Sequence, residues 1–214
     1  MTFAVASLTR EAPRRQRQGF FRDPAQLALL TREARRWAQA GAPEVRVWCA
    51  AAGTGEVPYS VAMVLADALQ DLPAEFRVLG TDSSTRALAF ARQARYPAAQ
   101  FAQLPLALRS RYCEPASVSG TDERVGANLR LRVAFRRLSL TTQPLTLRPG
   151  LDVIVCREQL GELRAFGRGR LLAELERLLK PGGLLLLGRG ESLDGSSHRF
   201  ESLTCSVYRK AAGP

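Results

Sequence analysis

The 214-residue chain has few of the residues on which many enzyme sites depend. It contains one histidine, His198, which argues against a His-based catalytic triad and against a zinc site, because both usually need more partners than this chain offers. Its four cysteines, at positions 49, 113, 156 and 205, form no C-x-x-C pair, and Cys49 and Cys156 lie in apolar, strand-like runs. We therefore expect buried, reduced thiols in a cytoplasmic protein. No apolar run approaches the roughly 18–20 residues that span a membrane, and no basic region precedes an apolar one at the N-terminus, so neither membrane insertion nor secretion is expected.

Lysine and aromatic residues are also scarce. Of 31 basic residues only Lys180 and Lys210 are lysines, and with 20 acidic residues the formal net charge is +11. This charge favours acidic partners such as a carboxylate-rich protein surface, nucleic acid or anionic lipid. Nucleic acid is the weakest of these, because base-modifying enzymes stack their target on aromatic side chains and only 7% of the residues are aromatic. The 46% of hydrophobic residues can form the core of one α/β domain.

Residues 45–63, VRVWCAAAGTGEVPYSVAM, predict the start of a nucleotide-binding crossover. An apolar strand at 45–51 meets the turn Gly53-Thr54-Gly55, and a helix follows. Glycine lets a ligand approach the backbone closely, and the N-terminus of a helix offers free N–H groups to polar ligand atoms.

Asp82 follows the strand predicted at 76–81. A carboxylate at the carboxyl end of the second strand can accept hydrogen bonds from both ribose hydroxyls of an adenosine. From these residues alone an ordinary βαβ turn with a solvated aspartate remains an equal alternative.

Periodicity and turn residues predict the remaining elements. The predicted helices are 24–40, 58–69, 85–93, 104–112 and 168–179, and the predicted strands are 45–51, 76–81, 151–156, 184–187 and 203–208, the last antiparallel at a sheet edge.

Residues 96–135 interrupt this alternation. Residues 111–118 and 128–135 are expected to be extended on either side of a turn at 120–122, and to form a small antiparallel flap inserted in the sheet. The expected organisation is a basic tail at 1–18, one domain at 19–210 that includes this flap, and a short tail at 211–214.

Seven blocks of the sequence together resemble one family. They are FFRDP, VWCAAAGTGEVPYSVAM, LGTDSS, LRSRYCEP, DVIVCRE, LLKPGGLLLLGRGESL and SVYRK. Over residues 18–210 the chain is similar to the chemoreceptor glutamate methyltransferase (CheR) family, a class I S-adenosylmethionine-dependent methyltransferase family. The resemblance implies an α/β, Rossmann-like fold, with a mostly parallel sheet, helices on both faces and a small antiparallel β flap. It also implies methyl transfer from S-adenosylmethionine to glutamate carboxylates of a bacterial chemotaxis or signalling receptor, with an acidic partner such as a chemoreceptor cytoplasmic helix.

The resemblance implies a set of site residues as well. Arg22 and Arg157 would be catalytic, because a guanidinium can hold an incoming carboxylate with two parallel hydrogen bonds. The carboxylate is already an anion at neutral pH, so catalysis consists mainly of alignment and exclusion of water. The implied cofactor-binding residues are Gly53, Thr54, Gly55, Asp82, Ser139, Leu140, Arg157 and Glu158.

The chain departs from the family pattern at several of these positions. At seven positions the family pattern has a side chain with an acid, amide, hydroxyl, phenol or imidazole group, and this chain has a different residue. These residues are Gln16, Gln18, Val57, Ser139, Glu158, Glu162 and Arg189. At about 4 Å a carboxylate at Glu162 would repel an incoming carboxylate by roughly 4 kcal/mol unless an arginine neutralised it. The alternative function is therefore a catalytically degenerate CheR-like protein that acts as a binding or scaffold module in signalling.

Overall fold

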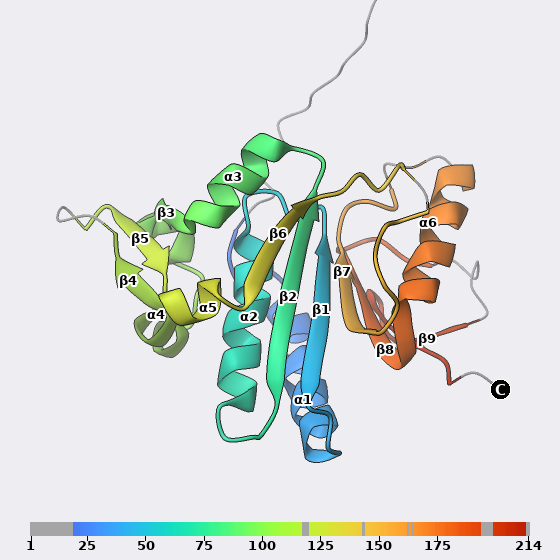
Figure 1. Ribbon diagram of the computed structural model, residues 1–214, viewed down its shortest axis with the longest axis horizontal. Helices are drawn as coiled ribbons and strands as arrows, with labels where there is room; N and C mark the ends of the chain where they lie inside the picture. The colour runs from blue at the N-terminus through green and yellow to red at the C-terminus, as the bar shows by residue number, and fades with distance from the viewer. Residues whose placement is uncertain are drawn as a thin grey trace, which may run out of the picture.

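The computed structural model describes residues 19–116, 120–142, 144–161, 163, 165–193 and 199–212. Within these ranges seven strands form one sheet in the order β6-β2-β1-β7-β8-β10-β9 (Figure 1). All neighbouring pairs from β6 to β8 are parallel, and β10 runs antiparallel to β8 and β9. The bounds are β1 (Glu44–Ala50), β2 (Glu75–Asp82), β6 (Val133–Arg137), β7 (Leu151–Cys156), β8 (Leu179–Leu187), β9 (Phe200–Thr204) and β10 (Val207–Lys210).

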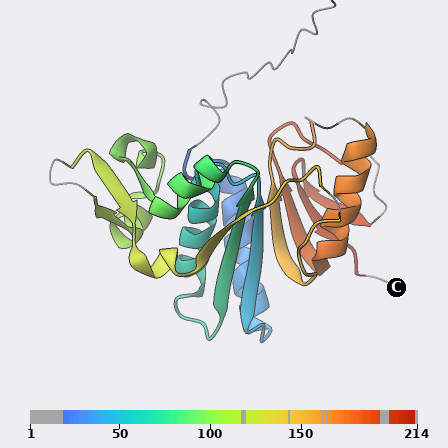
Figure 2. The same cartoon turned by 45° about the horizontal axis from the view of Figure 1, so that its top comes forward.

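Helices cover both faces of this sheet, which confirms the expected fold class (Figures 1 and 2). The main helices are α1 (Pro24–Gln39), α2 (Glu56–Leu69), α3 (Thr85–Gln93) and α6 (Ala165–Leu178). In β7, Val153 and Val155 belong to the core shared with α1 and α2, whereas Ile154 and Cys156 belong to the core shared with α6. A strand buried on both faces has to be apolar at every position, which is why this segment reads as a continuous apolar run.

The connections fix where a ligand can enter. From β1 the chain moves outward through β2 to β6, and it then returns to β7 on the opposite side of β1. The strand order therefore reverses between β1 and β7. In open α/β sheets the crevice at the carboxyl ends of such strands is where ligands bind.

A second, antiparallel sheet forms the predicted flap, at the left of Figure 1. Its strand order is β3-β5-β4, and a short helix, α4, lies between β3 and β4 in the chain. The ring of Phe20 lies 4.4 Å from that of Phe101 and 5.0 Å from that of Tyr96, so the start of the described chain packs against the flap. The bounds are β3 (Arg95–Pro97), α4 (Leu106–Tyr112), β4 (Cys113–Pro115) and β5 (Asp122–Val125).

The strands predicted for the flap were partly wrong. Of the stretch 111–118, only 113–115 is described as a strand, and 117–119 lie outside the described residues. The stretch 128–135 starts in a short helix, α5 (Ala127–Arg130), and its end belongs to β6, which pairs with β2 in the main sheet. The alternation of LRLRVAF suggested one strand, but Leu129 is buried on the helical turn and pairing with β2 begins at Val133.

Other expectations need smaller corrections. The strand predicted at 203–208 is a hairpin of β9 and β10, and β9 rather than β10 forms the sheet edge. Helix α6 begins at Ala165 instead of 168. Only Cys49 and Cys156 are buried, whereas Cys113 is half-buried and Cys205 is exposed. The basic tail expected at 1–18 and the single histidine lie outside the described residues.

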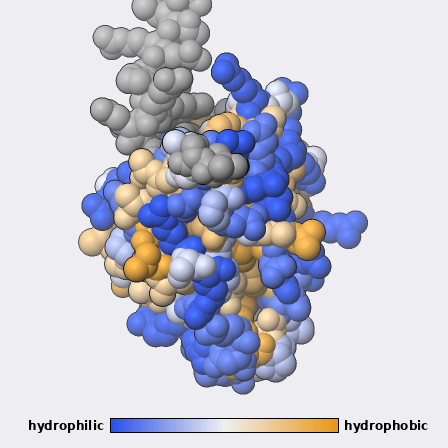
Figure 3. All heavy atoms as spheres, turned by 90° about the vertical axis from the view of Figure 1, so that its left-hand side faces the viewer, coloured by the Kyte–Doolittle hydropathy of each residue, from blue (hydrophilic) through white to orange (hydrophobic). Residues whose placement is uncertain are grey.

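The flap side of the molecule has a mainly hydrophilic surface with scattered apolar residues (Figure 3). In the part of the chain that the structure describes, the exposed large hydrophobic residues are Phe90, Leu106 and Leu131. None of the described helices combines the length and apolar character needed to cross a membrane.

Candidate active site

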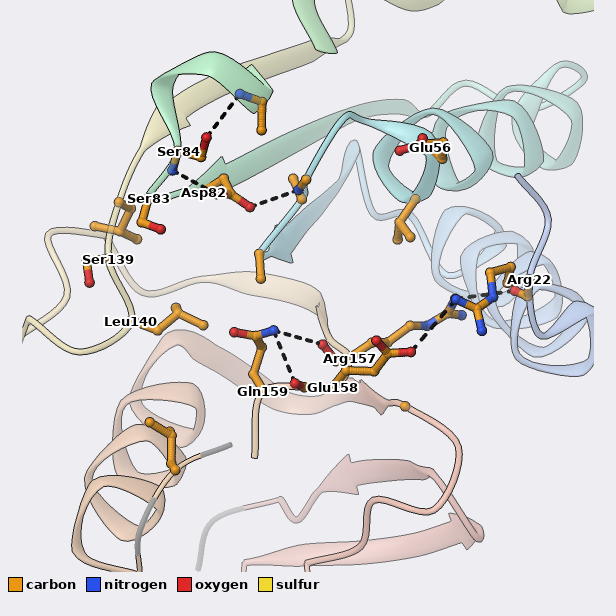
Figure 4. Close-up of a pocket in the computed structure, with 18 of the residues that line it drawn as sticks. Arg22, Glu56, Asp82, Ser83, Ser84, Ser139, Leu140, Arg157, Glu158 and Gln159 are labelled. Carbon is orange, nitrogen blue, oxygen red and sulfur yellow. Dashed lines mark hydrogen bonds and ion pairs between the residues drawn. The ribbon is translucent and has the colours of Figure 1, made fainter. Parts of the chain in front are cut away.

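A cavity of about 770 Å³ lies at the carboxyl ends of the central parallel strands. This volume is within the range of small-molecule and cofactor sites. Its walls come from the turn before α1, from the loops after β1, β2, β6 and β7, and from the end of β8 (Figure 4). Of the predicted site residues it brings together Arg22, Gly53, Asp82, Ser139, Leu140, Arg157 and Glu158.

Asp82 is oriented by two backbone donors. Its Oδ2 accepts a hydrogen bond from the Gly53 N–H at 2.9 Å, and its Oδ1 accepts one from the Ser84 N–H at 2.8 Å. Ser84 in turn caps α3 by accepting from the Ala87 N–H at 3.2 Å. Since each carboxylate oxygen can accept more than one hydrogen bond, Asp82 retains capacity for two ligand hydroxyls.

The loop after β6 forms the wall beside this aspartate, because the Leu138 N–H donates to the Asp82 carbonyl oxygen at 3.0 Å. Leu138, Ser139 and Leu140 all line the cavity. The Ser139 and Thr141 hydroxyls are hydrogen-bonded at 2.8 Å. This wall offers aliphatic surface with the two hydroxyl groups of Ser139 and Thr141, which suits the flat face of a heteroaromatic ring.

The other two residues of the glycine turn, Thr54 and Gly55, do not line the cavity. Gly55 has φ +103°, and a Cβ there would lie 2.7 Å from the Tyr96 hydroxyl oxygen. That hydroxyl donates to the Thr54 carbonyl oxygen at 2.7 Å. Both residues therefore shape the turn and fasten it to the flap, and only Gly53 contributes to the cavity wall.

Glu56 and Val57 begin α2 and also line the cavity. Glu56 is 4% exposed, and its carboxylate accepts from the Thr54 hydroxyl at 2.8 Å. Burial raises the pKa of this carboxyl group above its ordinary value, partly offset by hydrogen bonds. Val57 presents an apolar side chain where the family pattern has a second acid.

Arg22 and Glu158 face each other at the other end of the cavity (Figure 4). Arg22 Nη1 and Glu158 Oε1 are 3.8 Å apart, and the two side chains are 37% and 35% exposed. Glu158 has φ +60°, a conformation that is uncommon for a residue with a side chain. The Arg22 guanidinium is half-buried and lines the cavity, so an incoming anion can reach it.

Arg157 lies behind Arg22 and is 14% exposed. Its Nη2 donates to Gln26 Oε1 at 2.7 Å, and its Nη1 donates to the Arg22 carbonyl oxygen at 3.3 Å. Nη1 also lies 3.4 Å from Asp23 Oδ2. Burial lowers the pKa of Arg157, and the Asp23 charge opposes that shift. Both terminal nitrogens therefore point to protein atoms.

Glu191 joins the two loops at this end. Its Oε2 accepts from the Glu158 N–H at 2.7 Å and the Gly188 N–H at 2.8 Å, and its Oε1 accepts from the Leu160 N–H at 2.9 Å. One carboxylate thus fixes the backbone after β7 against the backbone after β8.

Arg189, one of the departures from the family pattern, lies at the cavity mouth. Its side chain is 81% exposed, and its Nε is 2.5 Å from Asp23 Oδ1. Three other departures, Gln16, Gln18 and Glu162, lie outside the described residues.

Sequence reasoning missed four residues of this site: Asp23, Gln26, Glu56 and Glu191. Three of them are acids within blocks that the sequence singled out, namely FFRDP, GTGEVPYS and GRGESL. Their position inside these blocks was the available signal. Gln26 gave no signal, because its role depends on contacts with residues 131 to 180 positions away.

Comparisons with known proteins place the chain in one family. Residues 16–209 match the CheR methyltransferase SAM-binding domain. Chemotaxis protein methyltransferase 2 of Pseudomonas aeruginosa is 34% identical over 193 residues, which are 90% of this chain and 69% of the relative. Chemotaxis protein methyltransferase of Escherichia coli is 34% identical over 190 residues, which are 88% of this chain and 65% of the relative.

A solved structure, a TehB-like SAM-dependent methyltransferase from Corynebacterium glutamicum, aligns with a TM-score of 0.45 and 15% identity over 88% of this chain and 97% of that one. The chain spans about two thirds of the length of the two chemotaxis relatives. The chain belongs to the CheR family of S-adenosylmethionine-dependent methyltransferases.

Proposed function

We propose that the chain transfers a methyl group from S-adenosylmethionine to glutamate side chains of a bacterial chemotaxis or signalling receptor. The observation that carries this proposal is a single cavity with an oriented aspartate, Asp82, at one end and a half-buried arginine, Arg22, at the other. One end suits a nucleoside, and the other suits a carboxylate.

The residues present fit the cofactor. Asp82 has free acceptor capacity for the ribose hydroxyls, and Ser139 and Leu140 supply the wall for the adenine. Gly53 keeps the turn close to the ligand, and the amino-acid end would lie toward Arg157 and Glu158. When bound, the cofactor supplies an electrophilic methyl group on a sulfonium.

The acceptor requires little acid–base chemistry from the chain. A glutamate carboxylate is ionised at neutral pH and is already the nucleophile. Arg22 can hold it by charge-assisted hydrogen bonds and aim one oxygen into the cavity. The enzyme's contribution is then alignment in a site with little water, which is the larger part of catalysis for such a transfer.

An acidic, helical cytoplasmic segment of a receptor fits the charge of the chain, which is +11. The relatives are named chemotaxis protein methyltransferases, which supports a receptor as the acceptor. A cytoplasmic location follows from such a substrate. Under this proposal, the domain at 19–210 binds both cofactor and acceptor.

The test combines binding with catalysis. The chain is titrated with S-adenosylhomocysteine by calorimetry, and labelled S-adenosylmethionine is incubated with cytoplasmic fragments of chemotaxis receptors. The proposal expects micromolar binding and base-labile methyl esters on the receptor fragments. Asp82→Asn should weaken the binding at least tenfold, since it removes charge-assisted acceptor bonds.

Asp71→Asn is the matched control. Asp71 is an exposed aspartate that lies just beyond the C-terminal end of α2, away from the cavity, and it pairs with Arg35. Absence of binding at millimolar S-adenosylhomocysteine would refute the proposal and favour the degenerate, scaffolding alternative. If the chain binds S-adenosylhomocysteine but forms no base-labile methyl ester on any receptor fragment, the cofactor site stands and the proposal that receptors are the methyl acceptor is refuted.

A further inference from the structure

The turn that presents Arg22 is strained. Phe21 and Asp23, on either side of Arg22, have φ angles of +56° and +58°. Left-handed backbone costs roughly 1–2 kcal/mol per residue that carries a Cβ, so it persists only where surrounding contacts enforce it. Because Arg22 lies between the two strained residues, the direction of its side chain depends on those contacts.

Two contacts hold the first half of the turn. The Phe20 ring is fully buried against the flap, and the Phe21 N–H donates to the Ser60 hydroxyl at 2.9 Å. Neither contact reaches past Phe21. In the second half of the turn the Asp23 carbonyl oxygen accepts from the Gln26 and Leu27 N–H groups of α1, and the Arg22 carbonyl needs a support of its own.

Asp23 and Arg157 supply this second support. The Asp23 side chain is 13% exposed, and its Oδ2 lies 3.4 Å from Arg157 Nη1. The same guanidinium nitrogen donates to the Arg22 carbonyl oxygen at 3.3 Å, so Arg157 is hydrogen-bonded to the backbone of Arg22 itself.

Gln26 extends this support to the sheet. Its Oε1 accepts from Arg157 Nη2 at 2.7 Å, and its Nε2 donates to the Leu187 carbonyl oxygen at 2.8 Å. Asp23, Gln26 and Arg157 therefore tie the Arg22 turn to the ends of β7 and β8, two of the strands that carry the cavity.

The charges explain why the aspartate is needed. Arg157 is largely buried, and burial of a guanidinium is unfavourable unless an anion compensates it. Asp23 is the carboxylate that meets Arg157 directly, while the carboxylate of Glu158 faces Arg22. Without Asp23, Arg157 would lose its direct counter-charge and tend to turn toward solvent, releasing its hydrogen bond to the Arg22 carbonyl.

We infer that Asp23 is a positioning residue for the acceptor: with Arg157 it fixes the backbone of Arg22 and thereby sets the affinity for the carboxylate to be methylated. This inference rests on the proposed methyl transfer. It assigns Arg157 a positioning role beside Asp23, in place of the direct carboxylate contact that the sequence suggested.

The test uses Asp23→Asn in the full chain. Asparagine has nearly the same shape and tolerates left-handed backbone, so the variant removes charge and leaves the turn sterically possible. We expect the KM for a receptor fragment to rise about tenfold, and the S-adenosylhomocysteine dissociation constant to change less than about twofold. A purely structural role would lower thermal stability and impair both ligands equally.

Two further variants make the result specific. Arg157→Lys keeps the positive charge but loses the planar guanidinium. The double variant with Asp23→Asn should raise the acceptor KM by less than the product of the two single increases, because both residues act through one contact. Asp71→Asn, which removes the charge of a different aspartate–arginine pair, should leave the KM unchanged.

The outcomes separate the two proposals. If the unmodified chain forms no methyl ester, the proposed function fails and this inference falls with it. If the unmodified chain methylates the receptor but Asp23→Asn has the same KM, or loses cofactor and acceptor affinity alike, only the positioning role is overturned. Independent, fully multiplicative losses in the double variant would also overturn it.

Discussion

Glu191→Gln tests whether one carboxylate holds together the two loops at the acceptor end of the cavity. In the native chain Oε2 accepts from the Glu158 and Gly188 N–H groups, and Oε1 accepts from the Leu160 N–H. Glutamine offers one acceptor oxygen and one NH₂ donor, so whichever way it points, one of these sets of N–H groups faces a donor.

The magnitude follows from these bonds. Hydrogen bonds to a charged group contribute about 1.5–3 kcal/mol each, and water can partly replace those that are lost, because Glu191 is only half-buried. We expect a loss of about 2–3 kcal/mol in the free energy of unfolding. For a chain of this size that loss lowers Tm by roughly 5–10 °C.

The assay is urea denaturation together with titration by S-adenosylhomocysteine. Because the loop held by Glu191 carries Arg157 and Glu158, affinity for the cofactor product should fall about fivefold or more. Gly188→Ala probes the same contact from the other side, since a Cβ there would lie 2.8 Å from Glu191 Oε2. It should show the same pattern of losses.

Glu201→Gln is the control, because Glu201 is an exposed glutamate on β9, an edge strand. It should change the free energy of unfolding by less than about 0.5 kcal/mol. If Glu191→Gln matched this control in stability and in cofactor affinity, the proposed role of Glu191 as the tie between the loops would be refuted.

Three other variants test separate parts of the site. Glu158→Gln removes the carboxylate that faces Arg22. This half-buried, solvent-accessible pair is worth about 0–1 kcal/mol, so the acceptor KM should fall up to about fivefold; steady-state methylation at saturating cofactor measures it, and a raised KM would contradict the prediction. Burial raises the pKa of Glu56 above its ordinary value of 4.5, so the stability that this group contributes is present below pH 4.5 and is lost as pH rises through the raised pKa. Glu56→Gln should therefore flatten the fall in unfolding free energy between pH 4 and 8, measured by urea denaturation, and parallel curves for the two proteins would count against the prediction. Gly55→Ala places a Cβ at φ +103° against Tyr96 and should cost about 2 kcal/mol or more in the same denaturation assay, whereas an unchanged midpoint would show that the turn relaxes freely.

The central crossover could be predicted because its signals are local. Strand β1, the glycine turn and α2 follow from an apolar run, a left-handed position that requires Gly55, and helical periodicity in adjacent residues. Asp82 could be placed for the same reason, since the end of a strand is marked by its own neighbours. The predicted elements lie close to the observed ones throughout this half of the chain.

The flap shows where local pattern fails. LRLRVAF alternates as a strand would, yet its first part is the end of α5, and β6 pairs with β2 about 55 residues earlier. Period-two alternation indicates one buried face, but it does not state which sheet covers that face. The partner is chosen by tertiary packing.

The sequence by itself determined the class of fold, the family, the glycine turn and the place of Asp82 at the end of its strand. These depend on backbone preferences and short motifs that act within a few residues. Only the tertiary structure decided that Arg157 donates to Gln26 and the Arg22 carbonyl, that Asp23 stands beside it, and that Glu191 ties two loops together. These contacts join residues about 30 to 135 positions apart, and a buried charge takes as its partner whichever polar group the folded chain places beside it.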